Sequence, residues 1–185
     1  KEAKAQEIKP IIGSEIYVSQ KSMYVKQNNG ENENYHLVLL VKNKEGYKNL
    51  MKIVSTASIE GFYYKPRVDH DYLREHSKGL IALSACMGGE VQANILKDNV
   101  KTAKEIALFY KKIFREGFYL ELQYHGIEEQ LKINQELISM SKELNIPLVA
   151  TNDVHYIRKE DYRSHDVLLC IQTGKTVDEE QRMRY

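Results

Sequence analysis

The chain has 185 residues, of which 42% are hydrophobic and 29% are charged, and this composition is typical of a folded globular domain. Lys and Arg total 27 against 26 Asp and Glu, which excludes the broad positive field that dominates nucleic-acid binding, so any contact with nucleic acid would be local. No apolar run approaches the roughly 20 residues of a membrane span, and the opening KEAKAQEIKP lacks the apolar core of a signal peptide.

The two cysteines indicate a reduced protein. Cys86 and Cys170 lie far apart in the chain and form no CxxC pair. This spacing favours neither a disulfide framework nor a structural zinc knuckle. A reducing, cytoplasmic location fits this cysteine usage best.

The first predicted elements are the end of a helix and a strand. Residues 1–7, KEAKAQE, are good helix formers with no capping residue before them, which is typical of the second half of a helix. They lead into an apolar, β-branched strand over 11–18, and the Asn-rich stretch 19–34 predicts an exposed loop or short hairpin. We therefore expect the chain to be a fragment of a longer protein.

Strands and helices then alternate along the chain. Residues 35–41 form a continuous apolar run, which is typical of a strand covered by helices on both faces. The next helix ends before Gly61, and its predicted apolar face consists of Tyr47, Leu50, Met51, Val54 and Ala57. A basic-aromatic loop and a short helix follow over 62–79; further strands are predicted at 79–86, 118–122 and 147–150, and further helices at 91–96, 102–114, 127–144 and 160–173.

This alternation predicts parallel β/α units, arranged as an open doubly wound sheet or as a barrel. In both architectures ligands bind at the carboxyl ends of the strands. The side chains at or just past those ends are Glu15, Cys86, Asp153 and His155, whereas His36 stands at the start of its apolar run. Asp153 and His155, two residues apart on an extended segment, would point to the same side and could reach one ion.

Each of these residues also has a simpler structural explanation. Asp153 could close an Asx turn while His155 packs beside its neighbour, Glu15 could lie on an edge strand, and a cysteine among small residues is usually a buried small hydrophobe. His36 could be a hydrogen-bonded core histidine. Glu60 could be an ordinary polar residue at the C-terminal end of a helix, although an acidic side chain there interacts unfavourably with the helix dipole. Their shared placement at one rim is what favours a metal site.

The two basic residues of one loop are weaker candidates, and a nearby histidine is not a candidate. The loop FYYKPR places Lys65 and Arg67 among tyrosines, where they could contact a phosphate or a base, or simply pack against a neighbouring surface. His70 lies in a charged short helix, and we interpret it as a surface residue.

Several blocks of the sequence, in order, resemble one known family. IKPIIGSEIYV, YHLVLLVKNKEGYKNLMKIVSTASIEGFYYKPRVD, GLIALSACMGGEV and IPLVATNDVHY are similar to the PHP (polymerase and histidinol phosphatase) domain of bacterial replicative DNA polymerase III alpha subunits. The ending DVLLCIQTGKTVDEEQRMRY resembles the passage from that domain toward the polymerase palm. The resemblance covers essentially the whole chain.

The resemblance implies an α/β fold, a distorted seven-stranded (β/α) barrel of the PHP type with metal ions at its carboxyl-end rim. It implies a partial PHP domain over 1–160, and the final PHP helix with the start of the connection to the palm over 161–185. The early HxH and Asp-His ligands of the family are absent, so the barrel is expected to be incomplete, with its first β/α unit or units missing. The metal ligands that it implies in this chain are Glu15, His36, Glu60, Cys86, Asp153 and His155.

The resemblance also implies what the full-length protein does. It would carry out template-directed DNA synthesis with Mg²⁺ on DNA and dNTPs, with a proofreading exonuclease and a sliding clamp among its partners and no membrane association. Its PHP site would be a phosphoesterase or 3′ to 5′ exonuclease centre, with zinc favoured by the thiol of Cys86 and manganese or magnesium as alternatives. Two other hypotheses are a free-standing PHP phosphatase acting on a small phosphomonoester, and a non-catalytic scaffold that binds the proofreading partner.

Overall fold

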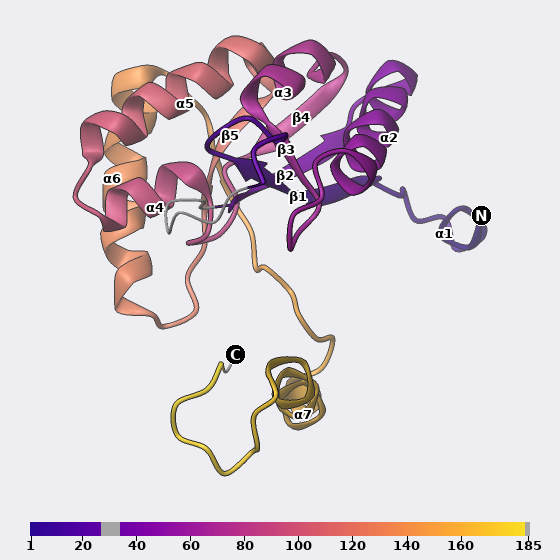
Figure 1. Cartoon of the computed structure of the whole chain (residues 1–185), viewed down its shortest axis with the longest axis vertical. Helices are drawn as coiled ribbons and strands as arrows, with labels where there is room; N and C mark the ends of the chain where they lie inside the picture. Colours follow the sequence, from indigo (N-terminus) through magenta and orange to yellow (C-terminus); the bar gives the residue numbers. More distant parts are fainter. Residues whose placement is uncertain (27–33, 184–185) are drawn as a thin grey trace. The chain divides into compact units, whose positions relative to one another are not determined.

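The alternating strands and helices form a mixed α/β structure in a computed structural model, which describes residues 1–26 and 34–183. The chain divides into two units, residues 1–151 and residues 152–185. The first unit contains a six-stranded sheet and most of the helices (Figure 1). The α/β class predicted from the sequence is therefore confirmed. The expected domain boundary at residue 160 stays a prediction, since structural units and family domains need not share limits.

The element bounds lie close to those that the sequence predicts. The strands are β1 (Gly13–Ser19), β2 (Asn34–Val41), β3 (Arg67–Asp69), β4 (Leu80–Leu83), β5 (Phe118–Leu122) and β6 (Leu148–Ala150). The helices are α1 (Glu2–Ala5), α2 (Lys44–Ile59), α3 (His70–His76), α4 (Glu90–Leu96), α5 (Val100–Phe114), α6 (Glu128–Leu144) and α7 (Tyr162–Thr173), with 3-10 turns at Arg115–Gly117 and Lys159–Asp161. Of the predicted loop or hairpin at 19–34, residues 27–33 lie outside the described residues.

The sheet is mixed rather than parallel, which corrects the expectation of uniformly parallel β/α units. The strand order is β3-β1-β2-β4-β5-β6, and β2 runs antiparallel to both of its neighbours. β1 pairs with β3, β4 with β5, and β5 with β6 in parallel. Because β2 is reversed, its first residues lie at the same end of the sheet as the carboxyl ends of β1 and β4.

β2 also differs from the prediction in its burial. Its side chains alternate, with Tyr35, Leu37 and Leu39 buried and the residues between them only partly buried. This is the pattern of an antiparallel strand with two different faces, and not of a strand covered by helices on both. The apolar type of the intervening residues, such as Val38 and Leu40, had hidden the alternation.

Helix α2 is rotated relative to its predicted buried face. Leu50, Ile53 and Ala57 are buried, whereas Tyr47 is 44% exposed and Met51 is 52% exposed. The helix starts at a cap in which the amide of Gly46 donates to Asn43 Oδ1 over 3.0 Å. Its first turn therefore lies against Gly79, where a Cβ on Gly46 would stand 1.7 Å from the Gly79 carbonyl oxygen. Gly46 thus lies on the buried side of the helix, together with Leu50, Ile53 and Ala57.

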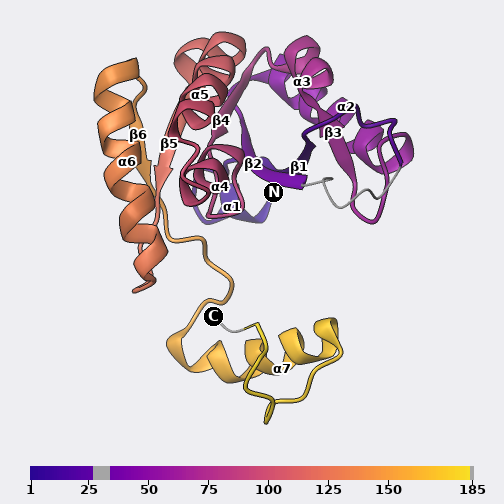
Figure 2. The same cartoon turned by 60° about the vertical axis from the view of Figure 1, so that its left-hand side comes forward.

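The core lies between the sheet and the helices that pack on it. Helix α2 contacts β1, β2, β3 and β4, helix α5 contacts β4 and β5, and helix α6 contacts β5, alongside which it lies in Figure 2. Helix α4 packs against both α5 and α6. Side chains from strands and helices together form one apolar cluster, including Val18, Leu39, Ile53, Phe118 and Leu137. The packed core holds the ends of the strands, where the candidate site lies.

The second unit contains α7 and the turn before it. Leu169 and Cys170 are its buried residues on the helix, and the Arg182 guanidinium forms an ion pair with Asp166 of the same unit. Among the helices in the described part of the chain, none has the length and apolar character needed to cross a membrane.

Candidate metal centre

Three predicted ligands meet where β1, β2 and the segment after β4 come together. In the register of β1 and β2, Tyr17 pairs with His36 and Glu15 pairs with Val38, so Glu15 and His36 point to the same face of the sheet. The His36 amide donates to the Gly88 carbonyl over 2.9 Å, which ties β2 to the loop that carries Cys86. Residues separated by 50 positions or more in the chain therefore lie in one place.

The imidazole of His36 contacts both of the other candidates. Its Nδ1 lies 3.2 Å from Glu15 Oε1 and 3.5 Å from Cys86 Sγ. The side chains of Glu15 and His36 are 43% and 28% exposed, so the cluster is open to solvent. The rings of Tyr17 and His36 pack in a T-shaped arrangement, with their centroids 5.1 Å apart.

The two contacts have the spacing of ligand pairs in a zinc site. Bonds of about 2.0–2.3 Å at tetrahedral angles place neighbouring donor atoms about 3.3–3.7 Å apart, close to both distances around His36. Within residues 1–26 and 34–183, however, no group of three or more His, Cys, Asp or Glu side chains is arranged to hold a metal ion. The structure therefore provides two ligand pairs that share His36 rather than a complete site.

Glu60 lies elsewhere. It follows the last residue of α2, and its Oε2 accepts a hydrogen bond from the Tyr24 hydroxyl over 3.1 Å. This hydrogen bond, together with slight burial, raises the pKa of Tyr24. In the described part of the chain the Glu60 carboxylate forms no hydrogen bond or ion pair with Glu15 or His36.

Asp153 and His155 belong to the second unit, residues 152–185. The segment is not extended at this point, because Asp153 has a φ of 44°. His155 Nδ1 lies 2.7 Å from the Asp153 carbonyl oxygen, and its ring lies 5.7 Å from that of His165. The premise that this pair points to one side of an extended segment is thus wrong, and its place as a ligand pair stays a prediction.

The two basic residues of the FYYKPR loop have different surroundings. Lys65 is exposed, and its Nζ lies 5.5 Å from the centre of the Tyr17 ring that packs on His36. Arg67 is fully buried, and its guanidinium donates to the carbonyl oxygens of Gly61, Met23 and Val25. Burial lowers the pKa of this guanidinium. Arg67 is thus buried and holds two chain segments together, whereas Lys65 is exposed, and a phosphate contact by either residue stays a prediction.

A family model described as the PHP domain matches residues 1–125 of the chain. The chain belongs to the PHP domain family. It is also 46% identical, over its whole length, to the DNA polymerase III alpha subunits of Borreliella burgdorferi and Thermus aquaticus, and 42% identical over 99% of its length to that of Deinococcus radiodurans. The chain spans only 16%, 15% and 14% of the length of these relatives. The resemblance inferred from the sequence blocks is confirmed.

Two polar clusters of this PHP domain were missed or misjudged from the sequence. His70 was expected at the surface but is partly buried. Its Nε2 lies 2.8 Å from the carboxylate of Glu90, which is buried. The same carboxylate accepts a hydrogen bond from the Tyr110 hydroxyl over 2.7 Å. Glu121, inside the predicted strand FYLEL, is only 4% exposed. A charged residue within an apolar strand was the available signal for Glu121, because such a group needs partners when buried.

Proposed function

We propose that the chain is the PHP part of a replicative DNA polymerase alpha subunit and carries a metal-dependent phosphoesterase site of the 3′ to 5′ exonuclease type. The observation that carries the proposal is the Glu15–His36–Cys86 cluster, in a chain that matches DNA polymerase III alpha subunits over its whole length. Template-directed DNA synthesis with Mg²⁺ would then belong to the rest of the full-length protein. The partners would be DNA, dNTPs, a proofreading exonuclease and a sliding clamp, in the cytoplasm.

Glu15, His36 and Cys86 would supply oxygen, nitrogen and sulfur ligands, with Asp153 and His155 completing the site and Glu60 as a further ligand. The thiol favours zinc, with manganese or magnesium as alternatives. A bound divalent ion supplies an acidified water molecule and a positive charge for the phosphate. Tyr17 packs against the His36 ring, and Lys65, exposed beside Tyr17, would contact a backbone phosphate of the nucleic acid.

The six-stranded sheet would be part of the distorted seven-stranded (β/α) barrel of the family. Two features support this proposal. β3 and β6 are the edge strands of the sheet, so each has one side on which a further strand could pair. The reversed β2 also brings ligands from neighbouring strands to one rim, as a site at the carboxyl end of a barrel requires.

One observation favours a second candidate function, a non-catalytic scaffold that binds the proofreading partner. Within the described residues no complete group of metal ligands is assembled. A family member whose ligand set had lost its function would retain the fold while the metal chemistry disappeared. Metal content and hydrolysis therefore have to be measured together.

The test compares His36→Ala and Asp153→Asn with a matched control, His76→Ala, which removes a histidine that stacks on Tyr72 away from the cluster. Zinc content is measured by elemental mass spectrometry on the 185-residue chain, and 3′-end trimming of a single-stranded oligonucleotide on the full-length protein. We expect both site variants to lower zinc content and trimming and the control to retain both. Unchanged zinc and unchanged trimming in both site variants would leave only the scaffold.

A further inference from the structure

The residue before Cys86 has an unusual backbone conformation. Ala85 has a φ of 67°, in the left-handed region that residues other than glycine rarely adopt. The conformation turns the chain sharply after β4, and Cys86 comes next, with its Sγ against His36. If Ala85 relaxed to an ordinary conformation, the direction of the Cys86 side chain would change. Something must therefore hold Ala85 in place.

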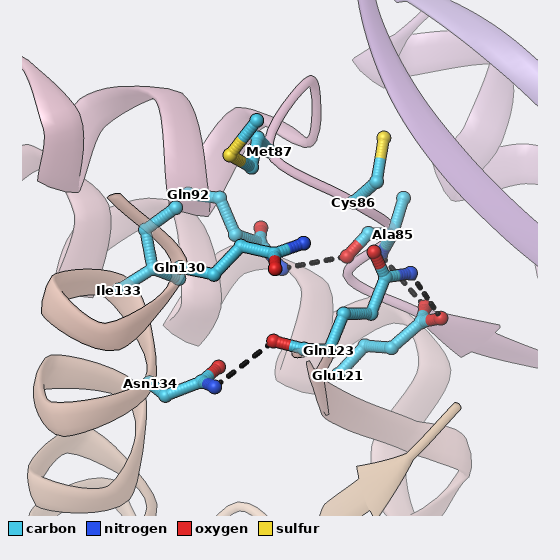
Figure 3. A pocket seen from close by; sticks show the side chains of 9 residues that line it. All are labelled: Ala85, Cys86, Met87, Gln92, Glu121, Gln123, Gln130, Ile133 and Asn134. Atoms are coloured by element: carbon cyan, nitrogen blue, oxygen red, sulfur yellow. Dashed lines mark hydrogen bonds between the residues drawn. The ribbon is translucent and has the colours of Figure 1, made fainter. Parts of the chain in front are cut away.

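Both polar groups of Ala85 are held by buried side chains, as Figure 3 shows. Its amide donates to Glu121 Oε2 over 3.0 Å, and its carbonyl oxygen accepts from Gln92 Nε2 over 2.9 Å. Glu121 is 4% exposed and Gln92 is 1% exposed. A hydrogen bond in a buried environment is electrostatically stronger than one exposed to water.

The two holding side chains are themselves fixed. Ser84 Oγ accepts from Gln92 Nε2 over 2.7 Å and from the Glu121 amide over 2.8 Å, which joins both to the end of β4. Glu121 Oε1 accepts from Gln123 Nε2 over 3.0 Å and from the Thr151 hydroxyl. Thr151 stands two residues before Asp153 in the chain. Glu121 thus joins the segment that carries Cys86 to the segment that leads to Asp153.

We infer that Glu121, with Gln92, is a positioning residue for the metal centre: it holds Ala85 in the left-handed conformation that directs Cys86 toward His36. This inference rests on the proposed function of the cluster. The carboxylate of Glu121 acts through the peptide of Ala85 and the hydroxyl of Thr151. Outer partners of this kind commonly change metal affinity by about 10-fold to 100-fold when they are removed.

The test replaces Glu121 by its isostere, Glu121→Gln, and uses Glu105→Gln, on the exposed side of α5, as the matched control. Two quantities are measured on the 185-residue chain. The first is the affinity for Co²⁺, together with the thiolate-to-cobalt absorption that reports on Cys86 as a ligand. The second, taken without metal, is the nuclear Overhauser contact between the His36 ring and Cys86. Glu121→Gln is expected to lower the Co²⁺ affinity about 10-fold or more, to weaken the thiolate absorption and to abolish the contact.

A second variant separates positioning from general stability. Gly adopts positive φ without penalty, so adding Ala85→Gly to Glu121→Gln should restore the thiolate absorption and the His36–Cys86 contact. A chain that had merely lost stability would gain nothing from this glycine. If Glu121→Gln retains the contact and the Co²⁺ spectrum, or if Ala85→Gly restores neither, the inference is wrong.

The outcome also separates this inference from the proposed function. If the unaltered chain binds no Co²⁺, the proposed metal centre is wrong. The nuclear Overhauser contact between the His36 ring and Cys86, measured without metal, then still tests whether Glu121 positions Cys86. If the unaltered chain binds Co²⁺ through the thiolate and Glu121→Gln does so equally well, the metal centre stands and the positioning inference fails.

Discussion

The buried guanidinium of Arg67 stabilises the fold through three hydrogen bonds to main-chain carbonyl oxygens. Arg67→Met retains most of the apolar stem and removes three hydrogen bonds, each 3.0 Å long, to the carbonyl oxygens of Gly61, Met23 and Val25. It also removes the contact with the Tyr63 ring, whose centre lies 5.2 Å from the guanidinium carbon. The loop before residue 27 would then be held to β3 mainly by the Met23 amide, which donates to Asp69 Oδ2 over 3.0 Å.

Two opposing terms determine the expected loss. Hydrogen bonds from a charged donor contribute about 1.5–3 kcal/mol each, so three of them amount to at least about 4.5 kcal/mol. Against this, the variant no longer desolvates a buried charge. Among residues 1–26 and 34–183 the Arg67 Nη1 atom has no hydrogen-bond partner, so removal of this group recovers part of the lost stability. We expect a net decrease of about 3 kcal/mol in the free energy of unfolding, within the range for breaking a buried polar network.

Urea unfolding followed by circular dichroism is the suitable assay, because the chain contains no Trp. With a denaturant slope of about 2 kcal/mol per M, a decrease of 3 kcal/mol moves the midpoint by about 1.5 M. The matched control is Arg74→Met, since Arg74 is exposed and pairs with Asp71 at the surface, where such pairs contribute little. If Arg67→Met and Arg74→Met shift the midpoint equally, the buried hydrogen bonds do not stabilise the fold as inferred.

Three further predictions follow from other sites. Gly46→Ala would place a Cβ 1.7 Å from the Gly79 carbonyl oxygen, so we expect about 1–3 kcal/mol of destabilisation in urea, and an unchanged midpoint would show that α2 moves freely. Burial, and then the neighbouring Glu90, raise the pKa of Tyr110 well above 10.0, so the folded chain retains a proton that the unfolded chain releases. The stabilisation from neutral Tyr110 is complete below pH 10 and falls as the pH rises beyond it. Tyr110→Phe should therefore reduce the fall of the unfolding free energy above pH 10, measured by urea unfolding. Equal pH dependence of the unfolding free energy in the two proteins would contradict this assignment. Cys86→Ser should weaken zinc binding about 10-fold or more, measured by competition with a chelator, while changing manganese binding less, and equal losses for both metals would argue against a thiolate ligand.

The family, the α/β class and most of the helices and strands could be predicted from the sequence alone. Residues 118–122 form β5 with the predicted bounds, because a short apolar run between polar residues is a local pattern. The position of Cys86 just past the carboxyl end of a strand was also predictable, since the apolar run that forms β4 is recognisable in the sequence. In each case the information lies within a few consecutive residues.

Features that depend on contacts between distant parts of the chain could not be predicted in this way. The direction of β2 depends on pairing with β1 and β4, and that reversal is what brings His36 to the ligand-bearing edge. The sequence shows an arginine in a basic-aromatic loop and a glutamate in a strand, but not that Arg67 is surrounded by carbonyl oxygens or that Glu121 holds Ala85. Whether a charge is buried and which groups satisfy it are settled only when segments 40 or so positions apart come into contact, and for that reason local patterns do not reveal them.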